Sequence, residues 1–385
     1  MYKLNLLLIA FVGSFAILLS SCSDDSDSID LIPLEVIAPN TYEWMDSNGD
    51  NTVSFGGQTT RLHQAAVICA NMGSSDATFA ELDEMFNLGE GFYDPSLNYS
   101  TSGKKVANKT GAYSANSADV LAMFNGWITE FTTDVVPAMV AGTEASAGVA
   151  GVLPDGTSTR ELNAKGMELD QLFTKGLIGA LCGDQIINGY LSEVKIGDDV
   201  DNIRSDEGGY TSMEHHWDEG YGYLYGLQPV KGVYDVNNTN MDVLLYKYYA
   251  KSNFASEQVA IYDAFKMGRE AITMDAGNDI PLYSDVKMAQ ADIVKTNISN
   301  IIIQKAYDYL SGAAEHLNAG GTRDGDFFHG LSEGVGFVVS LQFTNSNFSH
   351  SDVNAMMETL SSGDGLWDVT ASELEQMASQ IQAAL

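Results

Sequence analysis

One pattern occurs twice in this chain, as His215-His216-Trp217-Asp218-Glu219-Gly220-Tyr221-Gly222-Tyr223 and as His329-Gly330-Leu331-Ser332-Glu333-Gly334-Val335-Gly336-Phe337. Both copies read His-x-x-x-Glu-Gly-x-Gly-aromatic, and the histidine and the glutamate are displaced by the same number of residues. Residues four apart share one face of a helix. The repeat therefore predicts a duplicated helical unit, with two equivalent helices that meet near a pseudo-two-fold axis.

The chemistry of the repeat points to a metal site. Two such helices side by side would offer imidazole nitrogens and carboxylate oxygens, as the inward-facing clusters of helix-bundle metal proteins do. The candidate ligands, for a divalent metal or iron, are His215, His216, Glu219, His329 and Glu333. His216 lies three residues before Glu219, so which of the two histidines points inward stays open. The alternative is structural, because a buried histidine and glutamate can satisfy each other by hydrogen bonding.

Glycines and capping residues predict how closely the two motif helices pack and where they begin. A glycine inside a helix costs up to ~1 kcal/mol relative to alanine, so four matched glycines imply close packing of helices or close approach of a ligand. They are Gly220, Gly222, Gly334 and Gly336. Thr211 and Glu214 have capping-box spacing, which predicts that the first helix begins at Ser212. Asp324 or Asp326 is expected to cap the second helix.

Helical periodicity covers most of the remaining sequence. Apolar residues recur at helical spacing in the following segments: 60–72, 77–87, 117–139, 162–191, 212–226, 240–250, 255–274, 284–318, 325–343, 351–361 and 371–385. Residues 140–160 are rich in Gly, Ala, Ser and Thr and are expected to form a long loop. We predict a mainly α fold of two packed helical-bundle halves, roughly 41–200 and 201–385.

A small β-hairpin is expected at the start of this domain, over residues 41–57. Asp46-Ser47-Asn48-Gly49-Asp50 is a turn cluster, and Thr52-Val53-Ser54-Phe55 alternates as a strand does. The same stretch matches half of an EF-hand calcium loop, but Asn51 stands at the glycine position and Gly57 at the final glutamate position. The sequence favours a hairpin turn over a calcium loop.

The first residues resemble a bacterial lipoprotein signal. An apolar run from Leu6 to Leu19 is too short to span a bilayer comfortably and ends in Leu19-Ser20-Ser21-Cys22. We expect cleavage after residue 21, lipidation of Cys22 and an acidic flexible tether over 22–40. The protein would then be an outer-membrane lipoprotein, facing outward. The alternative is an ordinary secretory signal with a chance cysteine.

Composition limits the classes of partner. The 385 residues carry 52 Asp and Glu against 19 Lys and Arg, a formal net charge of −33. Such a surface repels phosphate backbones, so nucleic acid is not an expected partner. With Cys22 lipidated, Cys69 and Cys182 remain, both in apolar helical contexts. Two buried free thiols are favoured over a disulfide.

The chain also resembles a family of uncharacterised Bacteroidota lipoproteins, catalogued as a domain of unknown function, from about residue 40 to the end. The resemblance rests on these runs: Gln58-Thr59-Thr60-Arg61-Leu62, Lys165-Gly166-Met167-Glu168, Lys175-Gly176-Leu177-Ile178-Gly179-Ala180-Leu181, Asp184-Gln185-Ile186, Met213-Glu214-His215-His216-Trp217-Asp218-Glu219 and His329-Gly330-Leu331-Ser332-Glu333. That family is similar to imelysin-like proteins, which are all-helical with two bundle-like halves, were once called peptidases and are associated with iron uptake.

The imelysin motif is Gly-x-His-x-x-Glu, and His216 to Glu219 match its second part. Glu214 stands at the glycine position, and the second copy spaces its pair by four residues, so the match is partial. The resemblance implies a metal role for His216 and Glu219.

Three functions follow as hypotheses. The first is a surface lipoprotein that binds a metal ion or metal complex, an accessory in iron acquisition beside an outer-membrane receptor. The second is a metal-dependent, peptidase-like hydrolase; no Gly-x-Ser-x-Gly motif supports a serine hydrolase. The third is a non-catalytic module that binds protein or glycan through the tyrosine-rich segment 210–249 and the 140–160 loop, although tyrosines are more often core residues. The sequence favours binding over catalysis.

Overall fold

A computed structural model describes residues 34–204, 209–237 and 242–385. The chain divides into two units, Met1–Leu34 and Glu35–Leu385, and the second is a helical domain. The expected signal peptide (1–21), the lipidated Cys22 and the tether as far as residue 33 lie outside the described residues.

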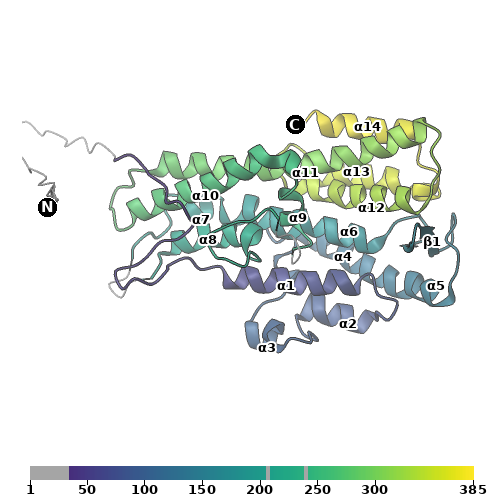
Figure 1. The fold of residues 1–385 in the computed structure, drawn as a ribbon, viewed down its shortest axis with the longest axis horizontal. Coiled ribbons are helices and arrows are strands. Elements are labelled where there is room, and N and C mark those ends of the chain that lie inside the picture. The colour runs from purple at the N-terminus through teal and green to yellow at the C-terminus, as the bar shows by residue number, and fades with distance from the viewer. Residues whose placement is uncertain (1–33, 205–208, 238–241) are drawn as a thin grey trace, which may run out of the picture. The chain divides into compact units, whose positions relative to one another are not determined.

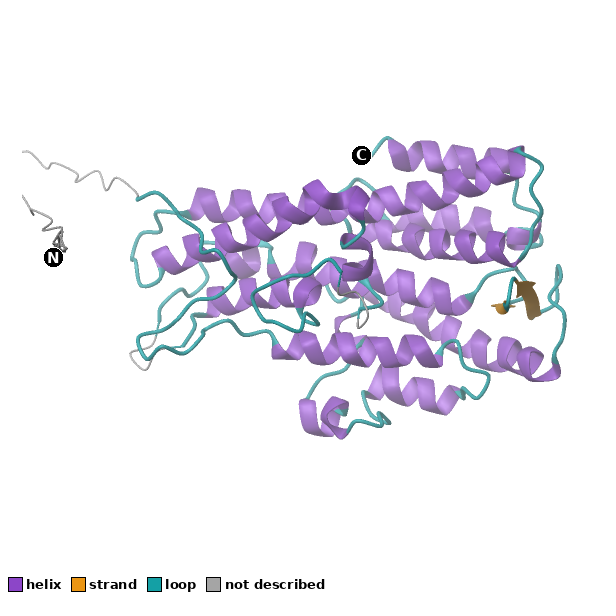
Figure 2. Ribbon diagram, viewed as in Figure 1, coloured by secondary structure: helices purple, strands orange, loops and turns teal. Residues whose placement is uncertain are grey.

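Helices make up most of the domain, as the sequence predicted (Figure 1, Figure 2). The α-helices are α1 (Gly56–Asn71), α2 (Phe79–Asp83), α3 (Tyr99–Ser102), α4 (Ser117–Glu130), α5 (Val136–Ala141), α6 (Leu169–Leu177), α7 (Glu193–Ile196), α8 (Ser212–Tyr225), α9 (Leu245–Tyr249), α10 (Ala255–Asp275), α11 (Ser284–Asn318), α12 (Gly325–Ser340), α13 (His350–Ser361) and α14 (Ala371–Gln382). Wider π-helical turns occur at Glu84–Leu88, Phe131–Val135 and Ile178–Tyr190, and 3-10 turns at Pro95–Leu97, Ala107–Lys109, Ser252–Phe254, Leu341–Phe343 and Gly365–Trp367. None of the described helices is both long enough and apolar enough to cross a lipid bilayer.

The centre of the domain is one buried helical segment, Leu169–Tyr190, in which α6 continues directly into a π-helical stretch. We call it the central helix. Nearly all of its residues are buried, including the polar Lys175, Asp184 and Gln185, because other elements pack around it on every side. α12 packs against its first part and α8 against its second, while α11 packs against α10, α12 and α14. Elements from both expected halves therefore meet on one helix.

The two motif helices begin where the sequence predicted. Thr211 and Glu214 form a complete capping box, so α8 starts at Ser212. Asp324 caps α12 by accepting a hydrogen bond from the backbone of Phe327. The pairing differs from the expectation, however, because each motif helix packs chiefly against the central helix and not against the other motif helix.

The β structure lies mainly in the stretch that was expected to be a loop. β1 (Gly151–Asp155) and β2 (Ser158–Leu162) form an antiparallel hairpin, with Gly151 opposite Leu162. The expectation of a continuous loop over 140–160 was therefore wrong. Residues 41–57 contain only a bridge between Met45 and Asn51.

The turn in that bridge is the predicted hairpin turn. Asp46 Oδ1 accepts hydrogen bonds from the backbone N–H groups of Asn48 (2.8 Å) and Asp50 (3.0 Å). The same carboxylate accepts a third from Gly209 through Oδ2 (3.1 Å). Its oxygens thus close the turn and fasten it to a neighbouring loop. Cys69 and Cys182 are free thiols, as expected.

The matched glycines lie at close contacts between helices. A Cβ on Gly336 would lie 2.5 Å from Lys175 Cβ, and one on Gly334 would lie 2.8 Å from Tyr309 Cβ. On α8, a Cβ on Gly222 would lie 2.4 Å from Phe55 Cβ, whereas one on Gly220 would make only ordinary contacts. Gly336 allows α12 to approach the central helix closely.

We predict that Gly336→Ala destabilises the domain by about 1–3 kcal/mol, because the added methyl group overlaps the central helix. Gly330→Ala on the same helix is the matched control, since nothing lies within 4 Å of its added Cβ. The control should be as stable as wild type or more stable by up to about 1 kcal/mol. Urea unfolding followed by circular dichroism measures both, and equal effects of the two substitutions would contradict the packing argument.

Candidate functional site

The first motif helix is fastened by a fully buried ion-pair centre. α8 presents Glu214 and Asp218, one turn apart, to Arg269 on α10. Arg269 Nη1 lies 2.8 Å from Glu214 Oε1, and its Nε lies 3.1 Å from Asp218 Oδ1. All three side chains are 0% exposed. Burial raises the pKa of Asp218, and the charge of Arg269 opposes that rise.

This Arg269 centre also fastens the segment that precedes α1. Tyr42 donates a hydrogen bond to Asp218 Oδ1 (2.7 Å), and the backbone N–H of Ser54 donates to Asp218 Oδ2 (3.1 Å). Arg269 donates to Thr52 Oγ1 (3.2 Å) and lies over the ring of Trp44 at 5.0 Å. A buried charge requires such a complete set of partners, because an unpaired one is strongly destabilising.

The predicted ligands on α8 face other partners. The ring of His215 stacks on Tyr210 with centroids 4.6 Å apart, and its Nε2 lies 4.0 Å from Glu219 Oε1. His216 Nδ1 lies 2.8 Å from the carbonyl oxygen of Lys195. Burial lowers the pKa of His216.

Glu219 is tied to two other elements. Its Oε1 accepts hydrogen bonds from Gln58 on α1 (2.9 Å) and from Tyr190 at the end of the central helix (3.2 Å). Lys109 in turn donates to the Tyr190 hydroxyl (3.1 Å). The first motif therefore joins α8 to α1 and to the central helix.

The second motif helix has its own buried ion pair. Glu333 Oε1 lies 2.9 Å from Lys175 Nζ on the central helix, with side chains only 12% and 4% exposed. Tyr248 donates a further hydrogen bond to Glu333 (3.1 Å), and Lys175 donates to Gln171 (2.7 Å). Burial raises the pKa of Glu333, but the charge of Lys175 together with hydrogen bonds from Tyr309 and Lys175 lowers the value to about 2.

His329 belongs to a separate cluster, one turn before Glu333. Its Nδ1 lies 2.6 Å from Glu168 Oε2, at the start of the central helix. The same nitrogen lies 3.0 Å from Arg160 Nη1, and Arg160 pairs with Asp155 on β1 (2.6 Å). The hydrogen bond to Glu168 raises the pKa of His329 above its usual value.

In the structure, most of the predicted metal ligands contact protein groups other than one another. Their partners are Gln58, Tyr190, the Lys195 carbonyl, Lys175 and Glu168, and no group of three or more His, Cys, Asp or Glu side chains in the described part of the chain is placed to hold a metal ion. Sequence reasoning missed Arg269 altogether. Lys175 and Glu168 did stand in quoted motifs, but nothing in their spacing named Glu333 and His329 as their partners.

Most tyrosines of the segment 210–249 are core residues, although Tyr210 is 45% exposed. Tyr221, Tyr223, Tyr225, Tyr246, Tyr248 and Tyr249 are all at most 2% exposed. Tyr221 stacks on Tyr42 with ring centroids 3.7 Å apart, and Tyr225 donates a hydrogen bond to Tyr249 (2.8 Å). These rings are closed to a glycan.

A family model described as a domain of unknown function, DUF4856, matches residues 39–385. The chain belongs to the DUF4856 family. No curated protein and no solved structure matches the chain. What this DUF4856 protein does must therefore be argued from its own geometry.

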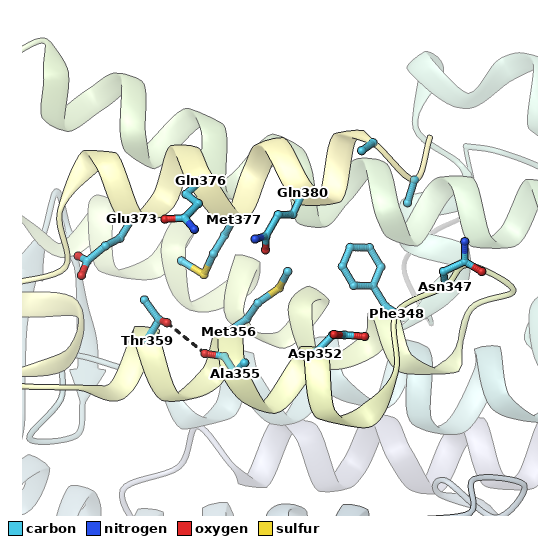
Figure 3. Close-up of a pocket in the computed structure, with 12 residues that line it drawn as sticks. Asn347, Phe348, Asp352, Ala355, Met356, Thr359, Glu373, Gln376, Met377 and Gln380 are labelled. Carbon is cyan, nitrogen blue, oxygen red and sulfur yellow. Dashed lines mark hydrogen bonds between the residues drawn. The ribbon is translucent and has the colours of Figure 1, made fainter.

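The DUF4856 domain has an open groove between its last two helices, α13 and α14 (Figure 3). Its volume is about 560 Å³. Met356 on α13 and Met377 on α14 face each other across it, and Phe348 lies at one end. Asp352 and Glu373 lie along its edges, and no lysine or arginine lines it. Hydrogen bonds from Ser349 and Thr370 lower the pKa values of Asp352 and Glu373 respectively, so both edges are anionic.

The His329 cluster generates a pH prediction for this DUF4856 protein. A histidine whose pKa is raised on folding stabilises the protein fully at pH values below its unfolded-state pKa of about 6.5. This stabilisation is lost as the pH rises through its folded-state pKa. We expect His329→Gln to be about 1 kcal/mol less stable than wild type near pH 5.5, with a smaller difference near pH 9. Urea unfolding at both pH values measures the difference, and His63→Gln is the matched control. A loss that does not change with pH would contradict a raised pKa of His329 in the folded protein.

Proposed function

We propose that this protein is a non-catalytic, cell-surface lipoprotein that binds a protein partner, and that the partner inserts a cationic amphipathic helix between α13 and α14. The observation that carries the proposal is the groove itself, which combines an apolar floor with anionic edges. The signal-like N-terminus, Leu19-Ser20-Ser21-Cys22, supports the location in the outer membrane.

The shape of the groove supports a helix as the occupant. α13 packs against α12, whereas α14 packs along α11, and the groove lies open between them. Met356 and Met377 at its floor are 5% and 4% exposed, and Phe348 at its end is half-buried. Methionine side chains adapt to varied apolar surfaces, and Met356 and Met377 form the floor. An amphipathic helix laid in an apolar groove is a recurrent mode of peptide recognition.

The charge of this region supports a cationic occupant. Residues 324–385 contain nine Asp and Glu residues and no Lys or Arg. Complementary charge speeds association and excludes anionic competitors. Acidic helices of other proteins would be repelled by Asp352 and Glu373.

The use of the motif residues supports binding over hydrolysis. Glu333 is paired with Lys175 and His329 with Glu168, so these groups stabilise the packing of α12 on the central helix. The partial match of His216 to Glu219 with the imelysin motif, seen in the sequence alone, is our reason to suggest a partner that acts in iron acquisition, such as an outer-membrane receptor.

Binding of a designed helical peptide, with leucines on one face and lysines on the other, tests the groove. We expect Ala355→Trp, which fills the groove from α13, to weaken binding at least about tenfold, because the peptide needs the space that the indole occupies. Ala80→Trp on exposed α2 is the matched control, since neither change alters the net charge. Fluorescence anisotropy measures both affinities. Equal affinity of the two variants would show that the peptide binds only through general charge attraction and would contradict the proposal.

Metal binding is a second candidate, favoured by one observation. His215 Nε2 lies 4.0 Å from Glu219 Oε1, and His215 Nδ1 has no hydrogen-bond partner among the residues described. Elemental analysis of protein purified without chelator, beside His215→Ala, tests it. Stoichiometric metal that is lost in a folded His215→Ala variant would support this candidate, and equal metal content in both proteins would contradict it.

A further inference from the structure

Two aromatic side chains beside the Arg269 centre each donate a hydrogen bond to a carboxylate. Tyr42 donates to Asp218 Oδ1 (2.7 Å), and the indole N–H of Trp44 donates to Glu270 Oε2 (2.7 Å). The two rings meet edge to face, with centroids 4.8 Å apart. Tyrosine and tryptophan rings are the ones in proteins that most readily lose one electron, and each then gives up its O–H or N–H proton to a base within hydrogen-bond reach. Both rings of this pair have such a base.

The pair leads from the edge of the domain into its core. Trp44 is 8% exposed and its partner Glu270 is half-buried, whereas Tyr42 is 0% exposed. A molecule in solution can therefore approach Trp44 but not Tyr42. Burial raises the pKa of Tyr42 well above its ordinary value, so the resting side chain is the neutral phenol. Burial also raises the pKa of Asp218, which favours its acceptance of the phenolic proton.

The neighbouring tyrosines are less well placed to keep a radical. Tyr42 stacks on Tyr221 with ring centroids 3.7 Å apart, and the Tyr221 hydroxyl has no hydrogen-bond partner among the residues described. Without a base, Tyr221 cannot release its proton as it loses an electron. Tyr190 and Tyr248 do donate to carboxylates, but over the longer distances of 3.2 and 3.1 Å. Tyr42 combines the shorter hydrogen bond with direct contact to a tryptophan ring.

We propose that Tyr42 is a redox-active tyrosine and that Trp44 relays one-electron oxidation to it from the surface. The oxidant is an oxygen-centred radical, which takes one electron from Trp44 and is itself reduced, while the indole proton passes to Glu270. Trp44 then recovers an electron from Tyr42 and its proton from Glu270, and the phenolic proton of Tyr42 moves to Asp218.

The net products of this relay are the reduced oxidant, a neutral Tyr42 radical and a protonated Asp218. The radical lies where solvent and a second radical cannot reach it, because the Tyr42 ring is completely buried. The domain thereby intercepts one-electron oxidants, an activity that is separate from the binding of a partner in the groove between α13 and α14.

Flash photolysis of the full-length protein in neutral detergent tests the relay, with photogenerated tris(bipyridine)ruthenium(III) as the oxidant. We expect a tyrosyl radical that outlives the radicals of exposed tyrosines such as Tyr93. Optical absorbance and electron paramagnetic resonance measure its yield and lifetime. Tyr42→Phe should lower this yield at least about tenfold, because it removes the O–H group that donates to Asp218. Tyr221→Phe is the matched control, since it removes a hydroxyl without a described partner and should leave the yield unchanged.

Trp44→Phe keeps the proposal testable if Tyr42→Phe does not fold. It keeps a ring at this position but removes the N–H group that donates to Glu270, so the long-lived radical should form at least about tenfold more slowly. Trp367→Phe is its control, because the indole N–H of Trp367 has no hydrogen-bond partner among the residues described. Absence of a long-lived tyrosyl radical in the wild-type protein would overturn the proposal. So would an equal yield in a folded Tyr42→Phe variant, or an unchanged rate of formation in Trp44→Phe.

Discussion

The structure depends on a buried arginine held between two carboxylates of one helix. Arg269 touches Glu214 and Asp218, and none of the three side chains reaches solvent. Burial of three charges is favourable only when each finds several partners, which fixes the positions of α8, α10 and the segment before α1 together. The ion pair between Glu333 and Lys175 likewise fixes the position of α12 against the central helix. The glycines of α12 add the close contact that this pair requires.

This arrangement separates the scaffold from the binding surfaces. Motif carboxylates that could have served chemistry are engaged inside the domain, whereas Asp352 and Glu373 lie at the surface and give one helix pair, α13 and α14, anionic edges. The anionic edges of this helix pair suit a basic helix, the occupant that we propose for the groove.

Local signals in the sequence predicted much of the fold. Periodicity gave the bounds of the helix at 284–318, and the Thr211–Glu214 spacing gave the start of α8. The hairpin at 151–162 was missed because its strands are short and their apolar and polar residues do not alternate. The repeat correctly identified two helices with special glycines, but the partners of the motif residues could not be predicted. Arg269 lies 51 residues beyond Asp218 in the chain, and only the tertiary packing brings them together.

Equilibrium unfolding of Arg269→Met, beside the triple variant Glu214→Gln/Asp218→Asn/Arg269→Met, tests the central claim most directly. The single variant leaves the buried Asp218 without a cation and Glu214 with only Arg204 as its ionic partner, so we predict a loss of about 3–5 kcal/mol or failure to fold. The triple variant removes the charges on both sides, and we predict that it recovers a large part of that loss. A single variant as stable as wild type, or a triple variant no more stable than the single one, would contradict the account.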